Sequence, residues 1–102
     1  MTTVGNPPPS PTSLTVRSTT TTTVTVAWTQ PAVVSGSAVR NYIIEYSTDG
    51  GTTWTVATKP VSTSKSATLS GFRTKSTYLF RVKAVNDVGE SGYSNTINVT
   101  TR

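Results

Sequence analysis

The chain has 102 residues, nine Lys and Arg against four Asp and Glu, a formal net charge of +5, and neither Cys nor His. A chain of this length forms one domain around one core. The missing His and Cys remove the commonest general base and the commonest metal ligands, so we expect no catalytic site, no metal and no cofactor. The basic residues are scattered, which disfavours a nucleic-acid partner, and no apolar run is long enough to predict membrane insertion.

Residues 1–11 predict a flexible or proline-rich linker ahead of a folded domain at residues 12–102. The linker ends with Asn6-Pro-Pro-Pro-Ser-Pro11, a composition that favours a stiff, extended polyproline conformation. Stiff linkers of this kind join domains. We therefore expect the partners to include neighbouring domains of a longer chain.

The first two strands follow from alternation of apolar and polar side chains. Residues 14–17 alternate in this way and predict an edge strand just after the prolines. Residues 23–29 repeat the pattern on strongly β-favouring residues, with Val24, Val26 and Trp28 on one face and Thr or Ala on the other. This second strand is expected to bury its Val and Trp side chains.

A third strand is predicted at residues 39–46, with Tyr42 facing inward and Glu45 outward. Asp49-Gly50-Gly51 then supplies residues that readily adopt the positive φ angles of a hairpin turn. Trp54-Thr-Val56 returns as a short fourth strand.

The most informative stretch runs from Ser66 to Ala84, because it predicts two strands joined by a corner. Leu69 and Phe72 face inward, and after a polar turn the apolar residues recur at every second position, including Tyr78 and Val82. In immunoglobulin-like sandwiches a tyrosine at the start of such a strand buries its ring and hydrogen-bonds its hydroxyl to upstream backbone. We expect Tyr78 to do so here.

A last strand around residues 97–100 brings the total to seven short strands, with no helical period anywhere. This pattern predicts an all-β fold, an antiparallel Greek-key β-sandwich of the immunoglobulin-like kind. Its expected structural core is Trp28, Tyr42, Leu69, Phe72, Tyr78 and Val82.

The order and spacing of these motifs resemble a fibronectin type III domain from Pro8 to Thr101. The motifs are Pro8-x-x-Pro11-x-x-Leu14-x-Val16, Val24-x-Val26-x-Trp28-x-x-Pro31, Tyr42-x-Ile44-x-Tyr46, Leu69-x-Gly71-Phe72, and Tyr78-x-Phe80-x-Val82-x-Ala84-x-Asn86-x-x-Gly89. The resemblance implies a non-catalytic spacer or presentation module of a multidomain extracellular protein, secreted or displayed on a cell or virion. The hairpin from Tyr46 to Trp54 looks more like the versions found in bacterial and phage surface proteins and in secreted polysaccharide-degrading enzymes than like the animal versions.

Four apolar residues of the loops form the candidate partner-binding site, namely Val33, Val34, Val88 and Tyr93. Apolar and aromatic side chains on Gly- and Ser-rich loops supply adaptable contact area. The alternative function is therefore adhesion or binding of a cell-surface, polysaccharide or protein partner. The same residues could instead fold over the end of the core. The isolated domain is expected to be a monomer.

Other polar and aromatic residues have simpler interpretations. Trp54 and Tyr93 are expected at opposite poles and thus unable to form one sugar-stacking platform. Arg81 and Lys83 are expected to point outward, where Glu45 could form a surface ion pair. Asp87 and Glu90 are expected to belong to a solvated acidic loop.

Overall fold

The computed structural model describes residues 9–29, 39–57, 64–86 and 89–102, and these ranges contain seven strands and no helix. Accordingly, no helix in the described part of the chain could cross a membrane. The strands are β1 (Thr12–Thr19), β2 (Val24–Thr29), β3 (Asn41–Ser47), β4 (Thr55–Val56), β5 (Ser66–Leu69), β6 (Thr77–Val85) and β7 (Ile97–Thr100).

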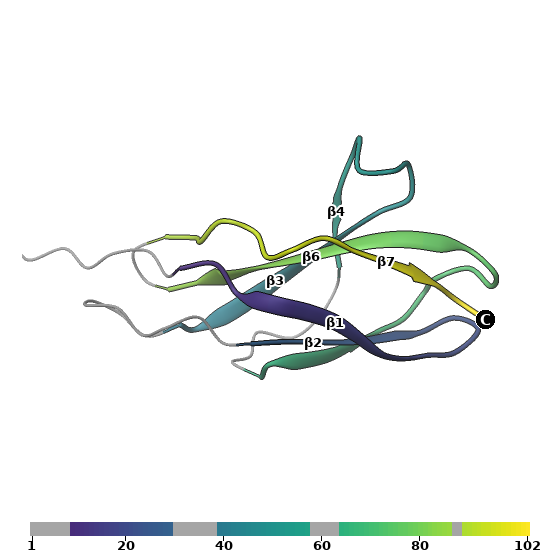
Figure 1. Cartoon of the computed structure of the whole chain (residues 1–102), viewed down its shortest axis with the longest axis horizontal. Coiled ribbons are helices and arrows are strands. Elements are labelled where there is room, and N and C mark those ends of the chain that lie inside the picture. Colours follow the sequence, from purple (N-terminus) through teal and green to yellow (C-terminus); the bar gives the residue numbers. More distant parts are fainter. Residues whose placement is uncertain (1–8, 30–38, 58–63, 87–88) are drawn as a thin grey trace, which may run out of the picture.

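The strands form two antiparallel sheets packed face to face (Figure 1). One sheet has the order β1-β2-β5 and the other β4-β3-β6-β7. The chain crosses between the sheets from β2 to β3, from β4 to β5 and from β5 to β6, so that β2 pairs with β5 and β3 with β6. This arrangement confirms the predicted immunoglobulin-like sandwich.

The core lies between the sheets because the strands alternate as expected. In β2, Val24 and Val26 are fully buried, whereas Thr25 and Ala27, which each follow one of them, are half-buried. The structure also buries each of the six residues expected in the core, the most exposed being Phe72 at 7%. Edge-to-face aromatic contacts organise this core: the rings of Trp28 and Tyr42 lie 5.1 Å apart and those of Tyr46 and Phe72 lie 5.2 Å apart.

Strand β1 departs from simple alternation, since Leu14 is buried but Val16 is 43% exposed. The register of β1 against β2 shifts twice, and Ser13 has a φ of 56°. Such irregularities rotate the side chains that follow them. Around the first shift, the backbone N–H of Leu14 donates to the side-chain oxygen of Asn95 and its C=O accepts from the Asn95 amide.

Replacing Trp28 by Ala should lower the free energy of unfolding by about 3–5 kcal/mol, because it removes a large buried ring and leaves a cavity. Urea unfolding followed by circular dichroism measures this loss. Val16→Ala is the matched control, with an expected change within about 0.5 kcal/mol at a surface position. Equal effects of the two substitutions would contradict the assignment of the core.

Candidate functional site

Tyr78 forms a corner between β5 and β6, as expected. Its hydroxyl accepts a hydrogen bond of 2.8 Å from the backbone N–H of Arg73, five residues upstream. The ring packs against Phe72, with 4.8 Å between centroids. A buried ring and one directed hydrogen bond thus fix the turn between two strands that belong to different sheets.

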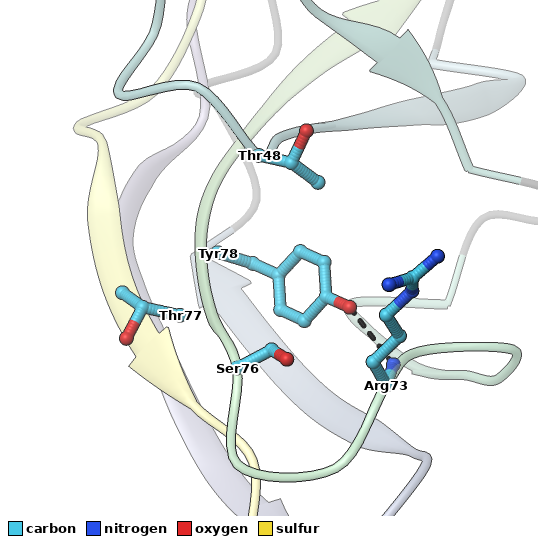
Figure 2. Close-up of a pocket in the computed structure, with 5 residues that line it drawn as sticks. All are labelled: Thr48, Arg73, Ser76, Thr77 and Tyr78. Carbon is cyan, nitrogen blue, oxygen red and sulfur yellow. Dashed lines mark hydrogen bonds between the residues drawn. The ribbon is translucent and has the colours of Figure 1, made fainter.

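An open cavity of about 400 Å³ lies beside this corner (Figure 2). In the figure, Thr48 and the Arg73 side chain stand on two sides of the Tyr78 ring. We call this cavity the corner pocket; its lining residues are Thr48, Arg73, Ser76, Thr77 and Tyr78.

The same corner holds the end of the chain. Thr101 is 3% exposed, and its hydroxyl donates to the C=O of Arg73 at 2.6 Å and accepts from the N–H of Ser76 at 3.0 Å. Beyond it, the N–H of Arg102 donates to the C=O of Thr20, and the N–H of Lys75 donates to the C=O of Arg102. The last two residues are therefore tied to two loops, an arrangement that we call the C-terminal clamp.

A second group of residues covers the outer face of the sheet β4-β3-β6-β7. We call it the outer-face cluster; it consists of Glu45, Trp54, Arg81, Lys83 and Tyr93. The central contact is the guanidinium of Arg81, which lies 4.0 Å from the ring centre of Trp54 and 3.6 Å from that of Tyr93. Aromatic faces attract such a cation.

Strand register brings the cluster together. Glu45 of β3 is paired with Arg81 of β6 and with Val56 of β4, and cross-strand partners share one face of a sheet. Trp54 directly precedes β4, and its indole N–H donates to the C=O of Gly51 at 3.1 Å. This bond within the hairpin turn helps to orient the indole ring.

Two serines place Tyr93 beside β6. The hydroxyls of Ser91 and Ser94 accept hydrogen bonds from the N–H groups of Ala84 and Val82, at 2.8 and 3.1 Å. The backbone N–H groups of the two serines donate in turn to the C=O groups of the same two residues. This irregular segment thereby takes the place of a paired strand along β6, and Tyr93 between the serines faces Arg81.

Glu45 is the anion at the centre of the cluster, and its side chain is 10% exposed. One carboxylate oxygen accepts two hydrogen bonds from Arg81, at 3.0 and 2.7 Å, and the other accepts one from the Tyr93 hydroxyl at 3.0 Å. Burial by itself would raise the pKa of Glu45, but the hydrogen bonds from Arg81 and Tyr93 and the charges of Arg81 and Lys83 outweigh it. They hold the pKa below its ordinary value of 4.5.

Lys83 completes the charge pattern. Its ammonium group lies 2.7 Å from the carboxylate of Glu90, and this hydrogen bond raises the pKa of Lys83. Glu90 is thus an ion-pair partner, whereas Asp87 lies outside the described residues. Together with Glu90, the cluster pairs its charges within the domain, which makes it suited to holding the sheet and the Tyr93 segment together.

Of the four residues expected to bind a partner, the described ranges include Tyr93 alone. Val33, Val34 and Val88 lie outside the described residues. Tyr93 is 38% exposed and belongs to the outer-face cluster.

The expectation that Trp54 and Tyr93 lie at opposite poles was wrong, because the pairing of β3, β4 and β6 brings both to Arg81. The guanidinium of Arg81 occupies one face of each ring, so those two faces cannot stack on a sugar.

The described residues contain no group of three or more Asp, Glu, His or Cys side chains that could hold a metal ion. The sequence carries one signal for the outer-face cluster. Ser91 and Ser94 lie on either side of Tyr93, and Arg81 and Lys83 point outward from the neighbouring strand. Only the register of the strands shows that these residues meet.

Comparisons with known proteins agree with this geometry. Residues 8–100 match the Fibronectin type III domain family, and the chain belongs to that family. It is 41% identical over 92 residues to the Titin homolog of Caenorhabditis elegans, covering 90% of this chain and 0% of that one after rounding. It is 35% identical over 95 residues to the human Cell adhesion molecule DSCAM, covering 92% of this chain and 5% of that one. The chain thus spans a small part of these relatives.

A solved structure shows the same fold. Domains A168-A170 of titin superpose with a TM-score of 0.86 at 28% identity, covering 96% of this chain and 33% of that one. The two relatives named above are animal proteins, so they give no support to the bacterial or phage origin expected from the hairpin.

The change in the free energy of unfolding at acid pH should reveal the contribution of the ion pair between Glu45 and Arg81. Because the folded pKa of Glu45 is lowered, its contribution is present above about pH 4.5 and is lost as pH falls through the folded pKa. Glu45→Gln should cost about 1–3 kcal/mol at pH 7, and the difference from the parent should shrink in acid.

Urea unfolding at a series of pH values measures this. The pKa of Asp49 is also lowered, chiefly by hydrogen bonds from Thr53, but Asp49 is present in both proteins and cancels in the difference. In an Arg81→Met background the cost of Glu45→Gln should be smaller. A cost that is the same in both backgrounds and at every pH would contradict the assigned pair.

Tyr78→Phe should lower the free energy of unfolding by about 1–2 kcal/mol, because the N–H of Arg73 loses its acceptor while the ring is kept. Chemical unfolding gives the value, and hydrogen exchange of the Arg73 amide should become faster. An unchanged exchange rate at Arg73 would show that the corner bond is not formed in solution.

Proposed function

We propose that the chain acts as a non-catalytic spacer module that holds neighbouring domains of a longer chain at a fixed separation. The observation that carries this proposal is the opposite placement of the two ends of the described domain. In Figure 1 the start of β1 lies at one pole of the sandwich, and the C-terminus lies at the other. Neighbours attached at these poles are separated by the length of a folded sandwich.

The C-terminal clamp supports this proposal. A spacer transmits orientation only if the chain is fixed up to the point where it leaves the domain. Thr101 and Arg102 are bound through their backbone and through the Thr101 hydroxyl to the loops at that pole. The proline-rich composition of residues 1–11 favours a stiff connection at the opposite pole.

We also propose an extracellular or surface-exposed location for the module. This location fits the relative named Cell adhesion molecule DSCAM. The spacer function itself depends on the ends of the domain, so it holds equally in any compartment.

The second candidate function is binding of a protein partner, and exposed apolar surface favours it. Val56 is 60% exposed and Tyr93 is 38% exposed. Val56 is the cross-strand partner of Glu45, so it lies on the same face as the outer-face cluster. This surface, together with the loops around Val33, Val34 and Val88, is where we propose that a partner would bind.

Two copies of the chain joined head to tail test the spacer function by small-angle X-ray scattering. We expect an extended particle with a narrow range of shapes. Thr101→Val in the first copy removes the hydroxyl of the clamp at nearly constant volume and should widen that range. Thr100→Val is the matched control, since its exposed hydroxyl bonds only to Thr77 in the described structure.

A fourth tandem, with a Gly-Ser insertion between the copies, defines the behaviour of a flexible joint. If the parent tandem scatters like this flexible version, the spacer function is wrong.

A further inference from the structure

The buried tyrosine of the corner has hydrogen-bonding capacity that the described residues do not use. Tyr78 is 5% exposed, and its hydroxyl accepts from the N–H of Arg73. Within the described part of the chain, no acceptor is found for the proton of this hydroxyl. A buried hydroxyl group ordinarily finds partners for its proton. Here the hydroxyl borders the corner pocket.

The pocket also contains a cation that is paired with none of the described carboxylates. The side chain of Arg73 lines the cavity, and none of the described carboxylates lies within ion-pair distance of its guanidinium. A guanidinium offers several N–H donors in one plane, a geometry that matches a carboxylate.

Two further cations stand at the same pole. Lys75 and Arg102 are exposed, and their backbones are hydrogen-bonded to each other. The described acids are committed elsewhere: Glu45 and Glu90 bind Arg81 and Lys83, and Asp49 accepts hydrogen bonds from Ser47 and Thr53. None of the described Asp and Glu side chains forms an ion pair with Arg73, Lys75 or Arg102, a group of cations that we call the basic pole.

We propose that the corner pocket binds an Asp or Glu side chain of the polypeptide that adjoins the module at its C-terminal pole. The carboxylate would accept from the Arg73 guanidinium and from the Tyr78 hydroxyl, while Lys75 and Arg102 attract the surrounding acidic surface. This inference rests on the proposed spacer function, because it needs a neighbour at that pole. It adds the chemistry by which the neighbour is oriented.

An acidic polypeptide fits the pole better than a sulfated polysaccharide does. The backbones of Arg73 and Lys75 are hydrogen-bonded to Thr101 and Arg102, so a domain that follows in the same chain would come close to these cations by connectivity. The pocket adds a proton donor on a buried ring, which suits one inserted carboxylate. A sulfated polymer would need a row of cations along the surface.

The test is an NMR titration of the whole chain with an acetylated, amidated peptide of alternating Glu and Gly, and with the matching Gln peptide. At low ionic strength we expect the Glu peptide alone to bind and to shift the amide signals of the corner pocket. The double substitution Arg73→Gln and Lys75→Gln should weaken binding by roughly fivefold.

The matched control is the double substitution Arg17→Gln and Lys65→Gln, which removes the same charge at exposed positions outside the pocket. It should leave the affinity close to that of the parent. Equal weakening by both doubles, shifts confined to the outer-face cluster, or no binding of the Glu peptide would each overturn the proposal.

Preference for a sulfated heparin-type hexasaccharide over the Glu peptide would overturn it as well. The scattering experiment on the tandem addresses the spacer function with no acidic ligand present, so the two proposals can fail separately. Tyr78→Phe, if it remains folded by circular dichroism, should also weaken binding of the Glu peptide.

Discussion

The pairing of β3 with β6 is the constraint on which the rest of the structure depends. Over seven residue pairs, from Asn41 with Val85 to Ser47 with Leu79, it fixes which side chains face the core and which face solvent. Inside, it places Ile44 beside Val82 at the centre of the core; outside, it places Glu45 beside Arg81. A slip of one residue would exchange the two faces. One register therefore sets both the hydrophobic core and the outer-face cluster.

The Tyr78 corner extends this constraint to the end of the chain. Because the Tyr78 hydroxyl holds the backbone of Arg73, the loop between β5 and β6 has a defined path. The C=O of Arg73 can then accept from Thr101, which ties the C-terminus to the same loop. The fold of the core thus determines where the chain leaves the domain. A spacer needs this link between internal packing and the position of its end.

Much of the fold could be predicted from the sequence, because β-branched and aromatic residues alternate with period two in β2, β3 and β6. The exposure of Val16 could not be predicted, because the β1 register shifts on either side of it and the backbone of Leu14 nearby is hydrogen-bonded to the side chain of Asn95, far along the chain. The sequence also did not predict that Trp54 and Tyr93 both contact Arg81, for a related reason. Ser91 and Ser94 replace strand pairing by side-chain hydrogen bonds, and local alternation carries no sign of this.

The net charge of +5 is distributed unevenly between two surfaces of the domain, which composition alone does not show. On the outer face, Arg81 and Lys83 are balanced by Glu45 and Glu90, and their charges strengthen contacts within the domain. At the C-terminal pole, the cations of the basic pole form no ion pair with a described Asp or Glu side chain. Cations that are paired internally add little to the attraction of a partner, whereas unpaired cations act on whatever approaches them. Under the proposed spacer function, the C-terminal pole is therefore the surface on which electrostatic selection of a neighbour would act.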